Sequence, residues 1–174
     1  MTMLLRHALA ILALPFVVVV LVPRWLLRAY AASDTRWHPG ALGAMIAHIG
    51  GAIVFLLGFA LFAWCVSLFV RVGRGTLAPW DPTKALVAAG PYRYARNPMI
   101  SAVVTMLFGE ALHLGSRVLT VWGILFLLIN HAYFLLSEEP RLERRFGAAY
   151  LRYKEAVPRW VPRVPRARSS GESS

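Results

Sequence analysis

The dominant feature of the sequence is a set of long apolar runs that carry almost no charge. Of all residues, 58% are hydrophobic and 16% are charged, whereas a typical soluble domain is about half apolar and about a quarter charged. A run of roughly 18 or more apolar residues is typical of a membrane-spanning helix. The runs closest to this pattern are residues 8–22, 41–70 and 118–136. The chain is therefore predicted to be an integral membrane protein.

Two further features of the apolar segments complete the predicted fold. Residues 98–115 form a fourth hydrophobic stretch, which we interpret as a short or partly buried span because it carries Glu110 and His113. The first run resembles a signal peptide, but Arg24 and Arg28 follow the apolar residues directly, which favours a retained helix. We expect an all-α, polytopic membrane helical bundle of about four transmembrane helices, the last two a hairpin that turns at residues 115–117.

The charge distribution predicts how the bundle lies in the membrane. The formal net charge is +11. If both termini are cytoplasmic, the inner segments hold 15 of the 19 Lys and Arg residues, which is the positive-inside pattern. The membrane is thus the expected partner and a nucleic acid is not, and the style of the sequence favours a bacterial inner membrane. Cys65 is the single cysteine, which excludes an internal disulfide and a cysteine-based metal site; no metal site is predicted.

Composition divides the chain into three parts. Residues 1–71 are expected to form two N-terminal transmembrane helices. Residues 72–165 are expected to form the functional core, which begins with a loop rich in Gly and Pro. After Leu136, apolar residues recur at helical spacing opposite Arg and Lys, which predicts a C-terminal amphipathic helix at the cytoplasmic interface. Residues 166–174 are expected to be a disordered tail.

Three polar sets within the core are candidates for chemistry. The first, residues 90–98, combines a tight turn with aromatic rings, guanidinium groups and an amide, although it would also serve as an interfacial anchor. The third, residues 157–163, places Arg159 and Arg163 beside the membrane surface, where lipid anchoring is the simpler interpretation.

The second set joins His131 to a pair of carboxylates, Glu138 and Glu139. In a continuous helix, His131 and Glu138 are seven residues apart and share a face. Intramembrane ionisable groups indicate function by default, but acids at the start of the following helix would also stabilise its N-terminus. Glu110 and His113 are expected to form a structural polar clamp with Asn130 or His131 across the hairpin.

Together these sets resemble a known group of membrane enzymes. GPYRYARNP, a helical hairpin that ends in EEPRLERRFGAAYLRY, and then VPRWVPR follow one another in an order typical of the isoprenylcysteine carboxyl methyltransferase and phospholipid methyltransferase family. The resemblance extends from about Gly75 to Arg163. It departs from the family pattern where tyrosines are common, at residues 99–101 and at Ser137.

The resemblance implies methyl transfer that depends on S-adenosyl-L-methionine, at the cytoplasmic face of the membrane. Carried over to matching positions, two segments wrap the cofactor. The implied cofactor-binding residues are Gly90, Pro91, Tyr92, Arg96, Asn97 and Pro98 on one side, and His131, Glu138 and Glu139 on the other. A carboxylate suits the amino group or ribose hydroxyls of the cofactor, and Arg96 suits its carboxylate.

The acceptor is expected to be a lipophilic small molecule or a lipid, with a carboxylate, amine, thiol or lipid head group as the nucleophile. A carboxylate needs no general base, and Arg159 or Arg163 would orient it. An amine needs one, for which His131 or a Glu is the candidate. The implied catalytic residues are therefore Arg159 and His131. Two alternatives remain: a membrane reductase that uses a nicotinamide cofactor, and a non-catalytic scaffold that retains the fold.

Overall fold

The computed structural model describes residues 14–34, 36, 40–72 and 89–160. This part of the chain contains helices and turns and no strand, which confirms the all-α prediction. The elements are η1 (Val17–Leu21), α2 (Val22–Ala29), α3 (Gly40–Val72), η2 (Gly90–Arg93), α4 (Pro98–Leu114), α5 (Arg117–Tyr133), η3 (Phe134–Glu138), α6 (Glu139–Phe146) and α7 (Ala148–Ala156).

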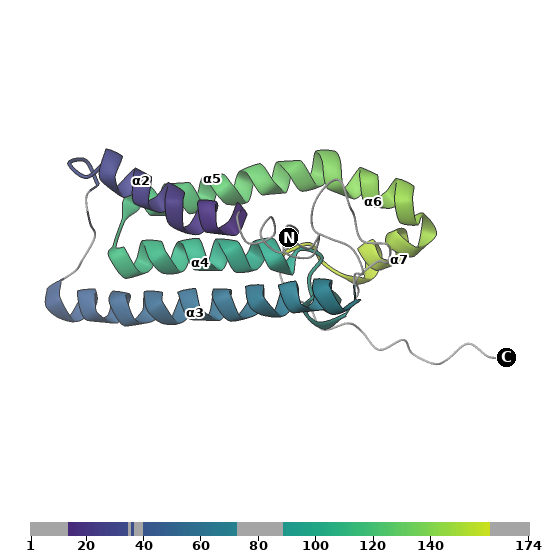
Figure 1. Cartoon of the computed structure of the whole chain (residues 1–174), viewed down its shortest axis with the longest axis horizontal. Coiled ribbons are helices and arrows are strands. Elements are labelled where there is room, and N and C mark those ends of the chain that lie inside the picture. Colours follow the sequence, from purple (N-terminus) through teal and green to yellow (C-terminus); the bar gives the residue numbers. More distant parts are fainter. Residues whose placement is uncertain (1–13, 35, 37–39, 73–88, 161–174) are drawn as a thin grey trace, which may run out of the picture.

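Three long helices lie side by side and define the two ends of the molecule. Helix α4 lies between α3 and α5, while η1 and α2 pack against α4 and α5 (Figure 1). We call the end that contains the start of α3 and the α4–α5 turn the hairpin end. The opposite end, where η2, α6 and α7 lie, is called the η2 end. The buried apolar core lies along α4, and Ala102, Met106 and Leu107 are almost completely enclosed.

Small residues let α3 and α4 pack with their backbones close together. A Cβ atom added to Gly58 would lie 2.9 Å from the carbonyl oxygen of Ala102, and one added to Gly109 would lie 2.5 Å from the amide nitrogen of Phe55. Gly51 is equally tight, because its added Cβ would meet the backbone of His113. Close backbone contact through small residues is how membrane helices gain packing energy without a hydrophobic driving force.

The hairpin turn forms at the residues that the sequence indicated. Gly115 adopts a left-handed conformation, with φ of 62°, and ends α4. Ser116 then caps α5, because its Oγ accepts a hydrogen bond from the amide of Leu119 at 3.2 Å. Asp34 completes the cap, since its carboxylate accepts from Ser116 Oγ at 2.7 Å and from the amide of Val118 at 3.2 Å. The two predicted final spans therefore form a hairpin.

Two prolines each follow a π-helical turn. Pro23 follows η1 and Pro140 follows η3, in each case two residues after the turn ends. In i→i+5 geometry the carbonyl of Val18 would accept from residue 23, but proline has no N–H to donate. Trp122 supplies the donor instead, since its indole N–H bonds Val18 O at 3.2 Å. The second π turn, η3, lies beside the candidate site, where it has larger consequences.

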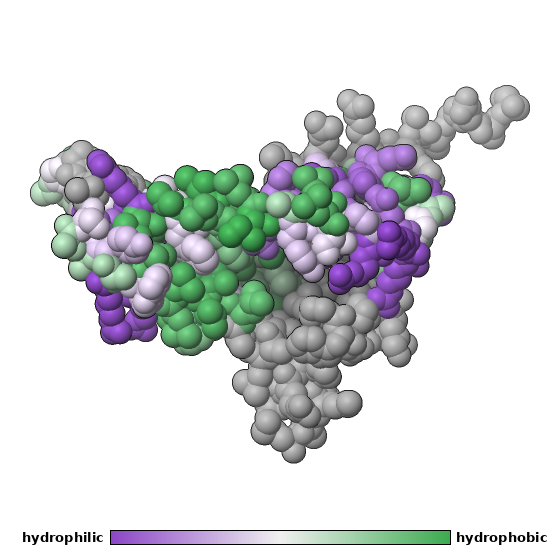
Figure 2. All heavy atoms as spheres, turned by 90° about the horizontal axis from the view of Figure 1, so that it is seen from above, coloured by the Kyte–Doolittle hydropathy of each residue, from purple (hydrophilic) through white to green (hydrophobic). Residues whose placement is uncertain are grey.

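The surface agrees with a membrane environment. Two of the described helical segments, Gly40–Leu68 and Arg117–Phe146, are long and apolar enough to cross a membrane, and α4 is a shorter apolar helix. Figure 2 shows an apolar band over the middle of the bundle with hydrophilic residues toward both ends. Large apolar side chains such as Leu56, Leu57 and Leu128 are exposed. The predicted first run lies partly in residues 1–13, and the predicted tail at 166–174; both segments are outside the described residues.

Two sequence expectations are wrong in detail. The single amphipathic helix after Leu136 is instead the pair α6 and α7, because Gly147, with φ of 51°, breaks the helix between them. The clamp expected of Glu110 and His113 with Asn130 or His131 does not form among the described residues. Glu110 Oε2 is buried without a hydrogen-bond partner there, and His113 makes its contacts on the other side of α4. His113 stacks on His48 of α3 at 3.6 Å between ring centroids, and the Nδ1 atom of each ring bonds the other residue's carbonyl oxygen at 2.9 Å.

Candidate functional site

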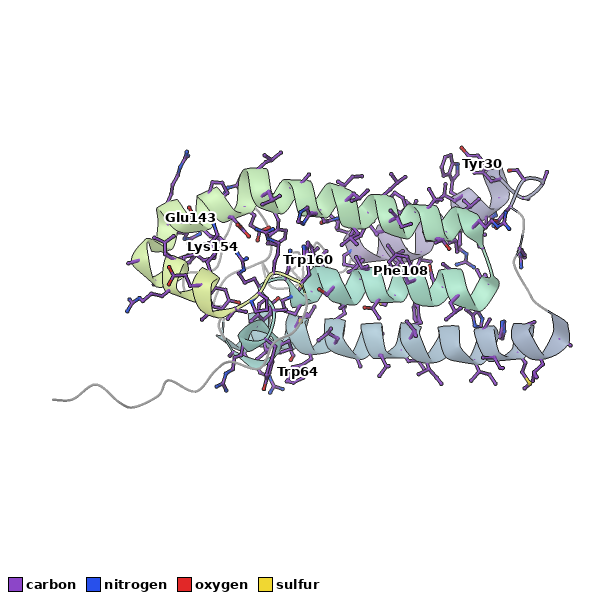
Figure 3. All side chains as sticks on the ribbon, turned by 180° about the vertical axis from the view of Figure 1, so that it is seen from behind. Tyr30, Trp64, Phe108, Glu143, Lys154 and Trp160 are labelled. Atoms are coloured by element: carbon purple, nitrogen blue, oxygen red, sulfur yellow. The ribbon has the colours of Figure 1, made fainter. Side chains whose placement is uncertain are left out.

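Three segments that are distant in sequence meet at the η2 end. The amide of Arg96 donates to the carbonyl of Pro158 at 2.8 Å, which ties the loop before α4 to the segment after α7. Trp160 donates its indole N–H to His131 Nδ1 at 3.0 Å, which ties that segment to α5. Figure 3 shows Trp160 near the start of α4, with Glu143 and Lys154 facing each other across α6 and α7. The three polar sets of the sequence are therefore parts of one region.

Glu139 lies at the centre of this region, surrounded by cations. Its side chain is 5% exposed, and its Oε1 bonds Arg96 at 2.7 Å and Arg159 at 2.8 Å. Lys154 approaches Oε2 at 3.3 Å and also pairs with Glu143. Burial of a carboxylate is tolerated only where such partners satisfy it. The cluster of Arg96, Glu139, Lys154 and Arg159 is called the basic cluster below.

The π turn η3 determines which of the two adjacent glutamates lies among the cations of the basic cluster. In a regular helix, His131 and Glu138 would share a face. The π turn inserts one residue, so Glu139 instead of Glu138 lies on the same helix face as His131. His131 and Glu139 accordingly contact two consecutive residues, Trp160 and Arg159. The predicted alignment of His131 with Glu138 is wrong for this reason, and π turns of this kind occur often at functional sites.

Two buried donor atoms in the site have no hydrogen-bond partner among the described residues. They are the Nε atom of Arg96 and the Nδ2 atom of Asn97. Asn97 precedes Pro98, the first residue of α4, yet its side chain does not cap that helix, although Asn is among the preferred N-cap residues. Its residue exposure is 5%. Since an unpaired buried donor costs about 1–3 kcal/mol, this pair is suited to a bound group that supplies acceptor atoms.

Several predicted residues lie beside the basic cluster rather than in it. Gly90, with φ of 55°, faces Leu68 and Trp64 of α3, and a Cβ there would meet their side chains. Tyr92 is buried against Cys65 of α3. Its carbonyl accepts from Tyr153 Oη at 2.7 Å. Burial raises the pKa of both phenols above the usual range, which keeps Tyr153 protonated as a donor.

An apolar cleft of about 230 Å³ adjoins the basic cluster. Its walls come from α3, the segment that contains η2, the start of α4 and the segment after α7. The lining residues are Leu61, Trp64, Pro91, Tyr94, Ala95, Pro98, Ser101 and Trp160. Pro91 and Pro98, predicted to contact a cofactor, therefore face this cleft.

The tautomer of His131 follows from its partner. An indole N–H is only a donor, so Nδ1 of His131 must accept, and the neutral ring carries its proton on Nε2. Sequence reasoning identified His131 but not Trp160 as its partner. It also missed Lys154 and Tyr153. Trp160 lies within the third polar set, but that set did not indicate its bond to His131, and no local pattern marks Lys154 or Tyr153. These contacts depend on how the chain folds back after Gly147.

Comparison with known proteins identifies the class of the chain. The family model for phospholipid methyltransferases matches residues 46–149. This range includes η2, the α4–α5 hairpin, and Arg96 and Glu139 of the basic cluster. The chain therefore belongs to the phospholipid methyltransferase family. An uncharacterized protein of Haemophilus influenzae is 33% identical over 63 residues, which are 36% of this chain and 100% of that protein. No solved structure matches the chain significantly.

Membership of the family implies methyltransferase activity on lipid or membrane substrates. Two helices of spanning length and the exposed apolar band agree with association with a membrane. The resemblance noted in the sequence to this family is thereby confirmed.

Proposed function

We propose that the protein transfers a methyl group from S-adenosyl-L-methionine to a lipophilic acceptor at the cytoplasmic face of the membrane. One observation carries this proposal: the buried donors Arg96 Nε and Asn97 Nδ2 have no partner among the described residues. They lie in the segment that the family resemblance implies for cofactor binding. A carboxylate or another acceptor-rich group of the cofactor fits this donor pair.

In this proposal, some residues of the site bind the cofactor and others orient the acceptor. S-adenosyl-L-methionine supplies an electrophilic methyl group on a sulfonium leaving group. Arg96 and Asn97 would hold the acceptor atoms of the cofactor, and Glu138 would accept from its amino group or hydroxyls. Arg159 donates its Nε to Glu139, and its remaining N–H groups would orient an anionic acceptor. Alignment and exclusion of water are the main contributions of a protein to such a reaction.

The membrane arrangement belongs to the same proposal. Four spans with both termini cytoplasmic would place the η2 end at the inner surface of the membrane, where most Lys and Arg residues lie. Residues 72–165 would then form the catalytic unit, and the two preceding helices would anchor it. A cofactor from the cytoplasm and an acceptor from the bilayer would meet at the η2 end. A bacterial inner membrane is the proposed location.

A non-catalytic scaffold is the second candidate, and one contact favours it. Glu139, which the resemblance assigns to cofactor binding, already bonds Arg96, Arg159 and Lys154. A carboxylate with three cationic partners can serve structure alone. The scaffold interpretation predicts a folded protein that does not bind the cofactor product.

Isothermal calorimetry with S-adenosylhomocysteine separates these two candidates. The methyltransferase proposal predicts binding to the purified protein in detergent, with loss of binding in Asn97→Ala and in Glu138→Ala. Asn130→Ala is the matched control for Asn97→Ala, because the side chain of Asn130 bonds only its own helix, at Phe126 O, in the described structure. Absence of binding to a demonstrably folded wild-type protein would favour the scaffold.

A further inference from the structure

The apolar cleft is distinct in character from the basic cluster beside it. Proline, aromatic, alanine and leucine residues make up most of its walls, and the hydroxyl groups of its lining residues belong to Ser101 and Tyr94. The Ser101 hydroxyl is already used, since it donates to the carbonyl of Asn97 at 3.1 Å. A cleft of this kind attracts an apolar group and offers few polar contacts to a hydrophilic one.

The size of the cleft limits what it can hold. Its volume is about 230 Å³, below the range of about 300–1,000 Å³ that is typical of drug-sized ligands. One slender apolar chain fits this space better than a pair of acyl chains or a fused ring system. The cleft thus selects for the shape of the apolar group as well as for its polarity.

The position of the cleft joins it to the proposed reaction site. Pro98 lines the cleft and directly follows Asn97, whose Nδ2 is an unpartnered donor. Trp160 lines it too and directly follows Arg159, a member of the basic cluster. An amphiphile with its chain in the cleft would therefore have its polar group beside Arg159 and next to the donors that are proposed to hold the cofactor.

Exposed aromatic residues lie on the cleft wall nearest the surface. Trp64 is 54% exposed and Tyr94 is 41% exposed. Trp64 belongs to α3, whose apolar side chains Leu56 and Leu57 are also exposed. Aromatic rings of this kind are typical of the level where a membrane meets water. A chain could therefore reach the cleft sideways from the bilayer.

We propose that this cleft binds the single apolar chain of an amphipathic acceptor and places its polar group at the basic cluster. The inference rests on the proposed methyltransferase function and specifies its substrate class. A single-chain amphiphile is the expected acceptor, and a two-chain phospholipid is not.

Photolabelling with a dodecanoic acid that carries a terminal diazirine tests the proposal. The full-length protein is labelled in detergent, and the modified residues are mapped by mass spectrometry. We expect label on Trp64, Tyr94 or Trp160 that unlabelled dodecanoic acid displaces and dioleoylphosphatidylcholine does not. Label on the exposed residues Leu128 and Ile129 of α5 should resist both competitors, because contact with lipid does not saturate.

A pair of variants locates the label. Ser101→Phe fills the cleft and should abolish the displaceable labelling, whereas Leu128→Phe adds the same ring to the exposed face of α5 and should leave it intact. Displaceable labelling that persists in Ser101→Phe, or that is absent from the wild type, would overturn the cleft assignment. Efficient competition by the two-chain lipid would also contradict it.

Binding of S-adenosylhomocysteine is measured on the same samples, so that the two proposals can fail separately. Chain labelling without cofactor-product binding would sink the methyltransferase proposal and leave the cleft as a lipid site. Cofactor-product binding without chain labelling would keep the methyltransferase and remove the cleft from it.

Discussion

The two ends of the molecule are built on different principles. At the hairpin end, polar groups pair with one another: His48 with His113, and Asp34 with Ser116. At the η2 end, a buried carboxylate gathers three cations while two neighbouring donors lack partners among the described residues. The hairpin end keeps one buried acceptor without a partner among the described residues, Glu110 Oε2, whereas the η2 end keeps two unpartnered donors beside a cluster of charges. That difference indicates where a ligand would bind.

The two ends also differ in what shapes them. Backbone contact between α3 and α4 extends from the hairpin end through Gly51, Gly109 and Gly58. At the η2 end, π turn η3 and Gly147 redirect the chain so that α6 and α7 fold over the site. Stability should therefore depend on shape along α3 and α4 and on charge at the η2 end.

The largest effect is expected from loss of the Glu139 carboxylate. Glu139→Gln leaves Arg96 and Arg159 partly buried without their anion, which should lower the free energy of unfolding by about 3–5 kcal/mol. Glu143→Gln removes a half-exposed partner of Lys154, and a loss of at most about 1 kcal/mol is expected. Thermal unfolding in detergent compares the two. Equal effects would mean that Glu139 is not the charge centre of the η2 end.

The next effect tests packing along α3. Gly51→Ala drives a methyl group into the backbone of His113, at an expected cost of about 1–3 kcal/mol for overpacking. The neighbouring Gly50 is the control, since an added Cβ would lie 3.9 Å from Leu112. Gly50→Ala should be neutral or stabilising by about 0.4–1 kcal/mol. Unfolding midpoints measure both changes, and the idea fails if Gly51→Ala is as stable as Gly50→Ala.

A smaller effect is expected from the stacked and hydrogen-bonded pair of His48 and His113. His48→Phe keeps a ring that can stack on His113 and loses the hydrogen bond to the His113 carbonyl, so a loss of about 0.5–1.5 kcal/mol follows. Binding of S-adenosylhomocysteine should not change, because this histidine pair lies at the opposite end of the molecule from the basic cluster. Calorimetry and thermal unfolding of one preparation check both parts. Weakened binding would show that the ends are coupled.

The smallest effect concerns alkaline pH at the η2 end. Burial raises the pKa of Tyr153, so the folded state favours the neutral phenol. The stability that this phenol contributes is complete below the unfolded pKa, which is about 10. It declines as pH rises from there toward the folded pKa. Tyr153→Phe should flatten the loss of stability above that pH, as followed by thermal midpoints. An unchanged alkaline slope would contradict this role for Tyr153.

Much of the fold could be predicted because it depends on local pattern. Apolar runs indicated α3, α4 and α5, and the turn between the last two was expected at residues 115–117. The candidate segments at 90–98 and 157–163 were identified too, and their described parts, up to residue 160, converge with His131 and Glu139. Helical periodicity and punctuation by Gly and Pro are short-range signals that a single sequence carries.

The rest depends on contacts between distant segments. The η3 turn moves Glu139 rather than Glu138 onto the face of His131. Pro140 follows this turn as Pro23 follows η1, but a proline by itself does not distinguish a π turn from a kink or a helix start. Asp34 caps a helix that begins more than eighty residues later. Gly50 and Gly51 are adjacent residues of the same type, yet only Gly51 lies in close contact with the backbone of α4. Such features follow from tertiary packing and not from spacing along the chain.

Hydrogen exchange with and without S-adenosylhomocysteine would compare the two ends in one experiment. If the η2 end holds the cofactor, the amides of residues 90–98 and 138–159 should exchange more slowly in the presence of the ligand. The amides of residues 40–51 and 109–118, at the hairpin end, should not change. Protection confined to the hairpin end, or no protection at either end, would contradict the assignment of the cofactor site to the basic cluster and its unpartnered donors.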